Sequence, residues 1–74
     1  MASVYSEEYQ LVINTLKKAR KDKGITQAQL AEALGNPQSF IAKVENGERR
    51  LDVVEFVHLA RLVGADLQRI IASI

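Results

Sequence analysis

Cysteine is absent from the 74-residue chain, and histidine occurs only once, at His58. Without thiols, neither a disulfide framework nor a thiolate zinc site can stabilise the fold. A single histidine excludes a histidine pair. Because His58 falls between apolar residues of a predicted helix, we also expect no serine, histidine and aspartate arrangement around it, no metal and no cofactor. Stability must therefore come from packed aliphatic side chains, and hydrophobic residues make up 47% of the chain.

The sequence also lacks long apolar runs. No run approaches the length of a membrane span, and no charged segment followed by an apolar one opens the chain. We therefore expect a cytoplasmic protein with no membrane partner. At this length there is room for one core, so residues 1–74 are predicted to form a single domain with 1–5 as a loose arm. So small a core rarely supplies the converging walls of a catalytic pocket, and we expect no enzyme.

The net charge is only +1, but its distribution is uneven. Residues 1–16 carry a net charge of −2, residues 17–50 carry +4 and residues 51–74 carry −1. A basic centre is typical of a surface that faces phosphate. From charge alone, an ordinary solvated helix face explains the pattern equally well.

Apolar residues recur at three- and four-residue spacing in five stretches, each bounded by a polar N-cap residue or a glycine. In the third stretch, Asn36 is expected to act as the cap and Pro37 to occupy the first helical position. No repeat and no strand pattern appears. The predicted helices run from Glu7 to Lys23, from Gln27 to Leu34, from Pro37 to Asn46, from Val53 to Val63, and from Leu67 onward.

The third predicted helix has two different sides. On a helical wheel, one side carries Pro37, Ile41 and Val44. The opposite side, free to meet a partner, carries Ser39, Ala42, Lys43 and Asn46.

Three polar residues on this helix are candidates for contacting base pairs. Gln38 can form a bidentate pair with adenine, Ser39 can bond several bases or a phosphate, and Lys43 can reach guanine or the backbone. Helix capping is the alternative for Gln38 and Ser39, and a solvated lysine is the alternative for Lys43. Phe40 lies between the two sides, where it can contact a thymine methyl group, although a place at the core edge is favoured.

The segment 25–35, ITQAQLAEALG, is followed by Ile41 and by VENG at 44–47. These residues and their spacing resemble the phage Cro and lambda-repressor type of helix-turn-helix, also called the xenobiotic-response-element family. The likeness runs without gaps from Leu16 to Leu67. It implies an all-α, compact five-helix bundle of the lambda-repressor-like DNA-binding type, in which the second and third helices form the helix-turn-helix.

The resemblance also implies roles for residues outside the third helix. Gln27 should bind a phosphate and brace Gln38, and Arg20 should form a buried ion pair with Glu45. The periodicity places Arg20 on the core-facing side of its helix, where a guanidinium without a partner would be costly. Members of this family often hold the DNA backbone at the end of the third helix and just beyond it. These positions match Arg49, Arg50 and the amides around Asn46 and Gly47. For each arginine alone, a solvated charge is an equally good explanation.

Two positions depart from the family pattern. Asn36 and Pro37 replace the usual turn rich in serine and threonine, which could shift Gln38 slightly, and Leu51 stands where proline is frequent. Neither change is expected to break the fold.

These features predict a sequence-specific double-stranded DNA-binding transcriptional regulator, with repression as the simpler role and no small-molecule ligand. One recognition helix contacts few base pairs, so we expect a homodimer on a palindromic operator. Ile70, Ile71 and Ile74 in the C-terminal helix are the candidate interface, unless they simply cover the core. A phage repressor, a restriction-modification controller and an antitoxin all fit this length. A protein-interaction module with weak DNA binding is the rival, and the low net charge favours it.

Overall fold

Five α-helices form the secondary structure of the described residues, 6–74, in the computed structural model, and this part contains no strand. The predicted arm, residues 1–5, lies outside the described residues. The all-α prediction is confirmed. The helices are α1 (Glu7–Asp22), α2 (Gln27–Leu34), α3 (Gln38–Glu45), α4 (Val53–Val63) and α5 (Leu67–Ala72).

Short polar side chains begin four of the helices. Ser6, Thr26, Asp52 and Asp66 each accept a hydrogen bond from the backbone N–H three residues further on. This bond satisfies one of the amides that a helix start leaves without an internal partner. Thr26 and Asp52 form complete capping boxes, because the side chain of the residue three positions later accepts from the N-cap amide in return.

The start of α3 differs from the prediction by one residue. Pro37, not Asn36, is the N-cap, and no side chain caps this helix. Asn36 instead belongs to the end of α2, where its backbone N–H donates to Ala31 O at 2.9 Å and its side chain donates to Leu34 O at 3.4 Å. The proline ring is exposed and does not share the buried side of α3.

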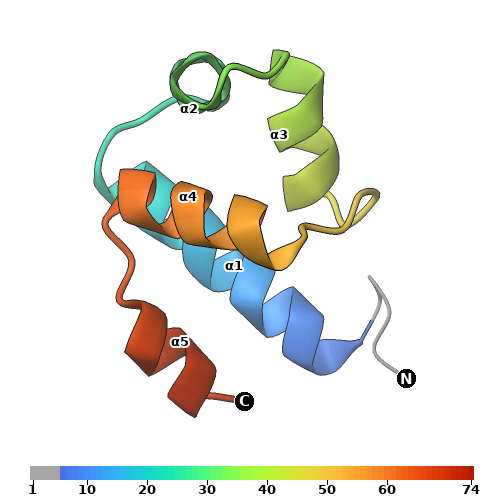
Figure 1. Cartoon of the computed structure of the whole chain (residues 1–74), viewed down its shortest axis with the longest axis vertical. Helices are drawn as coiled ribbons and strands as arrows, with labels where there is room; N and C mark the ends of the chain where they lie inside the picture. Colours follow the sequence, from blue (N-terminus) through green and yellow to red (C-terminus); the bar gives the residue numbers. More distant parts are fainter. Residues whose placement is uncertain (1–5) are drawn as a thin grey trace.

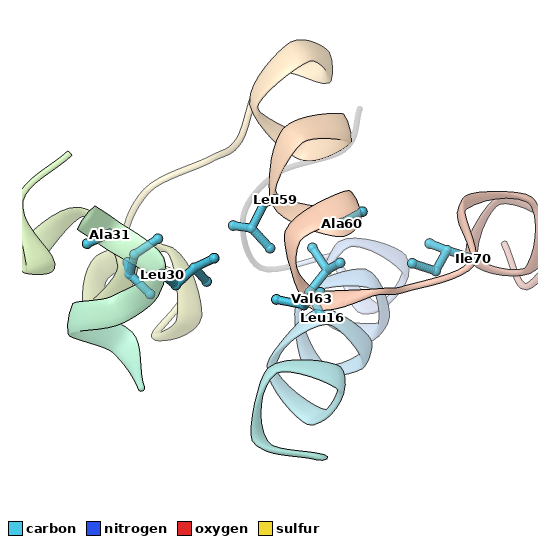
Figure 2. Close-up of a cluster of buried hydrophobic side chains, with 8 residues drawn as sticks. Leu16, Leu30, Ala31, Leu59, Ala60, Val63 and Ile70 are labelled. Carbon is cyan, nitrogen blue, oxygen red and sulfur yellow. The ribbon is translucent and has the colours of Figure 1, made fainter. Parts of the chain in front are cut away.

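Residues from all five helices meet in one core (Figure 2). α4 packs against both α1 and α2, while α3 packs against α1 and α2. The helix-turn-helix pair α2 and α3 lies at one end of the molecule and α5 at the other (Figure 1). The main cluster of buried side chains comprises Leu16, Leu30, Ala31, Ile41, Leu59, Ala60, Val63 and Ile70.

Gly35, which ends α2, sets the turn into α3. Its φ of 72° lies in the left-handed region, and a Cβ built there would meet nothing within 4 Å. Gly35→Ala should therefore cause no clash with other residues. It should lower the free energy of unfolding by about 1 kcal/mol, the cost of holding alanine in the left-handed conformation. Chemical denaturation measures this, with Gly35→Asn as the control, because asparagine tolerates this conformation better. Equal stability of the alanine variant and the wild type would contradict the assignment.

Candidate nucleic-acid interface

The two sides of α3 differ as predicted. Ile41 and Val44 are 0% and 1% exposed, which fixes the helix on the core. Ala42, on the predicted outer side, is half-buried. Ser39, Lys43 and Asn46 on that side are exposed, and so is Gln38 at the start of the helix.

The leading end of α3 carries free hydrogen-bonding capacity. Because Pro37 provides no side-chain acceptor, the backbone amides of Gln38 and Ser39 have no side-chain cap. The alternative that Gln38 and Ser39 serve as helix caps is therefore wrong. Amides at a helix start favour an anion, and a polar side chain beside them can reach further, so this end suits a phosphate flanked by base edges.

A buried ion pair fastens α3 to α1. Arg20 Nε donates to Glu45 Oε2 at 2.6 Å, and Arg20 Nη2 donates to Glu45 Oε1 at 3.0 Å. The two side chains are 8% and 7% exposed. The remaining Arg20 nitrogen, Nη1, donates to Ile25 O at 2.7 Å. The pairing implied by the resemblance is confirmed, and it resists rotation of α3 against the rest of the molecule.

Gln27 takes part in the same network. Its Nε2 donates to Glu45 Oε1 at 3.0 Å, and within residues 6–74 no hydrogen bond joins it to Gln38. The implied brace between Gln27 and Gln38 is thus replaced by a brace to the ion pair. The glutamine amide carries a second N–H and a carbonyl oxygen, so a phosphate contact by Gln27 stays a prediction.

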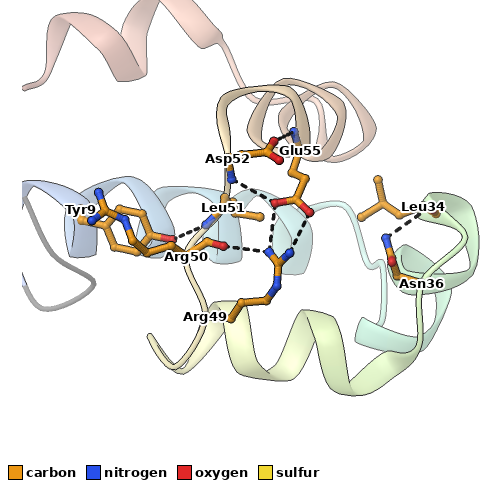
Figure 3. A network of polar contacts seen from close by, with 8 residues as sticks. All are labelled: Tyr9, Leu34, Asn36, Arg49, Arg50, Leu51, Asp52 and Glu55. Atoms are coloured by element: carbon orange, nitrogen blue, oxygen red, sulfur yellow. Dashed lines mark hydrogen bonds and ion pairs between the residues drawn. The ribbon is translucent and has the colours of Figure 1, made fainter.

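Arg49, in the link between α3 and α4, is not a simple solvated charge. Its Nη1 and Nη2 donate to the two carboxylate oxygens of Glu55, each at 3.0 Å (Figure 3). Its guanidinium carbon lies 4.4 Å from the centre of the Phe40 ring. The hydrogen bond from Arg49 lowers the pKa of Glu55, and the bond from the Asp52 amide lowers it further. The same carboxylate raises the pKa of Arg49.

Phe40 itself is half-buried against the core, as favoured from the sequence. Its ring also forms the platform under Arg49. Within residues 6–74 Phe40 therefore has a structural partner on each side.

The other predicted arginine, Arg50, is exposed and lies over the ring of Tyr9 at 5.4 Å. The Tyr9 hydroxyl accepts from the backbone N–H of Leu51 at 2.9 Å, which fastens the link to α1 (Figure 3). Sequence reasoning did not find Glu55 or Tyr9 as parts of this site. The one sequence feature that could have indicated Glu55 is its position three residues after Asp52, the spacing of a capping box.

Neither a metal-binding group nor a candidate membrane span is found in the part of the chain that the structure describes. His58 is exposed on α4, and no group of acidic and histidine side chains could hold a metal ion there. None of these helices has the length and apolar character needed to cross a bilayer.

The predicted interface on the C-terminal helix is divided. Ile70 is 5% exposed and belongs to the core, whereas Ile71 and Ile74 are 62% and 58% exposed. Val53 and Val54 at the start of α4 are also exposed, at 72% and 58%. Val53, Ile71 and Ile74 line a shallow apolar hollow.

Comparisons with known proteins agree with this architecture. A family model described as helix-turn-helix matches residues 16–70. A solved structure of an XRE-family like protein from Pseudomonas syringae pv. tomato str. DC3000 is 47% identical and superposes with a TM-score of 0.82. That match covers 89% of this chain and 80% of the other. No curated protein matches the chain.

Proposed function

Because the chain belongs to the xenobiotic-response-element family of helix-turn-helix proteins, we propose that it is a non-enzymatic transcriptional regulator that binds a specific double-stranded DNA sequence. In this proposal α3 enters the major groove and Gln38, Ser39 and Lys43 contact base edges. Gln27, Arg50 and the amides near Asn46 contact phosphates. Because the proposed ligand is DNA, we also propose that the protein is cytoplasmic.

The observation that carries the proposal is the rigid presentation of α3. Its polar side is exposed and its leading amides are uncapped, while Ile41, Val44 and the Glu45 ion pair hold its other side. A fixed helix gives base-edge contacts a defined register, which sequence specificity requires. Repression by blocking access to a promoter is the simplest role, because the five helices form one small core with no separate sensing unit among the described residues.

Selection of bound duplexes from a random pool tests the proposal. We expect one sequence to be enriched, with its affinity falling steeply as the salt concentration rises. A protein-interaction module would enrich no sequence and would bind DNA weakly, with little dependence on salt. That second result would contradict the proposal and favour the rival function.

We further propose that the regulator is a homodimer and that Ile71 and Ile74 form part of its interface. They are exposed apolar side chains that line one hollow together with Val53, and a second copy would remove them from water. Replacing both isoleucines with serine should yield a monomer in analytical ultracentrifugation. Loss of the second binding module should weaken binding to a two-half-site duplex on the order of 100-fold.

Leu62→Ser is the matched control for this pair of substitutions. Leu62 is 37% exposed and lines a different hollow, against α2. The Leu62→Ser substitution should leave the sedimentation behaviour unchanged. A wild-type protein that sediments as a monomer at all concentrations, alone and on DNA, would refute the homodimer.

A further inference from the structure

The guanidinium of Arg49 is fixed by three neighbours. Nη1 and Nη2 donate to Glu55, and Nη1 also donates to Arg50 O at 2.8 Å (Figure 3). The guanidinium carbon lies over the Phe40 ring. Despite these contacts the Arg49 side chain is 41% exposed. The group is therefore held in one orientation while part of it stays open to solvent.

A count of donors identifies the open part. An arginine side chain has five N–H groups, and the three hydrogen bonds to Glu55 and Arg50 use three of them. Within residues 6–74 the Nε–H and one Nη2–H have no acceptor. These two hydrogens lie on one edge of the planar group, at the spacing that suits two oxygens of a phosphate.

Glu55 is itself held in place. Its Oε1 accepts from the Asp52 amide at 3.0 Å, and Asp52 Oδ1 accepts from the Glu55 amide at 2.7 Å. This capping box anchors the carboxylate to the first turn of α4. The hydrogen bonds from Arg49 and from the Asp52 amide lower the pKa of Glu55, which favours the charged carboxylate.

The Arg49 side chain contacts α3, the proposed recognition helix, directly. Phe40, which supports Arg49, lies in the first turn of α3 beside Ser39. A phosphate on the open edge of Arg49 would therefore lie next to the end of α3 that is proposed to contact bases.

We propose that Glu55 is a positioning residue for DNA binding: with Phe40, it holds Arg49 so that the free guanidinium edge accepts one backbone phosphate. This inference rests on the proposed function. A free arginine loses side-chain entropy when it binds, and here that loss has already occurred on folding. Glu55 thus strengthens the binding of a polyanion although it carries a negative charge.

Simple electrostatics predicts the opposite result, which makes the inference testable. If the carboxylate only neutralised Arg49 or repelled DNA, its removal would tighten binding. The test is Glu55→Gln, whose amide oxygen can still accept from Asp52. Glu48→Gln is the matched control. Glu48 is exposed in the link that also carries Arg49, and its substitution removes the same negative charge. The probe is a labelled duplex of scrambled sequence, because a phosphate contact does not depend on base sequence.

Glu55→Gln should weaken binding about five- to tenfold and reduce the slope of log K against log salt by about 0.9, the loss of one phosphate contact. Glu48→Gln should bind as tightly as the wild type or more tightly. Arg49→Ala should weaken binding to a similar extent, and adding Glu55→Gln to it should cause no further loss. Phe40→Leu, which keeps an apolar core-edge residue but removes the aromatic platform, should also lower the slope.

Two results are decisive and distinct. Tighter binding by Glu55→Gln, equal to that of Glu48→Gln, would overturn the positioning role while leaving the proposed function intact. No salt-dependent binding by the wild type itself would refute the proposed function and this inference together. Circular dichroism and thermal unfolding of each variant separate a lost contact from a lost fold.

Discussion

Arg20→Ala is expected to lower the free energy of unfolding by about 3 to 5 kcal/mol, the cost of leaving a buried charge without its partner. The Glu45 carboxylate is 7% exposed and would lose both of its bonds to Arg20. Ile25 O would lose a donor as well. Thermal and chemical denaturation measure the loss, and an unchanged melting temperature would contradict the role given to the pair.

Two further variants sharpen this test. Lys18→Ala removes an ion pair whose side chains are 77% and 64% exposed, so it should change stability by less than about 1 kcal/mol. Replacing Arg20 and Glu45 together with methionine and leucine should recover much of the stability, because no buried charge then lacks a partner. A double variant less stable than Arg20→Ala would show that the network stabilises the fold in some other way.

Gln38→Ala is expected to cause the largest change in DNA specificity. A bidentate contact to a base contributes about 1 to 3 kcal/mol of discrimination, so affinity for the selected duplex should fall by a factor of about 5 to 150. Affinity for a scrambled duplex should hardly change. Competition binding with the two duplexes measures the difference, and equal loss on both would show that Gln38 contacts only the backbone.

Lys43→Ala provides the contrast for this experiment. If Lys43 contacts phosphate, its removal should weaken binding to every duplex and reduce the salt slope by about 1. If it contacts guanine, the loss should be confined to the selected duplex. Both residues are exposed, so neither substitution should alter stability by more than about 0.5 kcal/mol.

Features set by neighbouring residues could be predicted from the sequence. Thr26, Asp52 and Asp66 cap helices as expected, and Gly35 and Gly64 end them in the left-handed conformation. Each of these signals acts within one helical turn. The error at α3 arose where two such signals overlap, because the end of α2 and the start of α3 compete for Asn36.

Contacts between distant residues could not be derived from local pattern. Arg20 could be placed inside but not paired, and Glu45 came only from the resemblance. The Arg49 and Glu55 pair forms across a link, where no helical spacing applies. The sequence therefore predicts a DNA-backbone contact or a solvated charge for Arg49 and does not indicate Glu55 as its partner. Ile70 and Ile71 are adjacent and equally apolar, and only the packing of α5 shows that one is buried.

The central claim is that the exposed side of α3 is the surface that meets DNA. Amide chemical shifts recorded while the labelled protein is titrated with the selected duplex test it most directly. We predict the largest changes at Gln38, Ser39 and Lys43 and in the link at 46–50, with small changes on α5. Changes centred on Ile71, Ile74 and the start of α4, with α3 unaffected, would contradict the account.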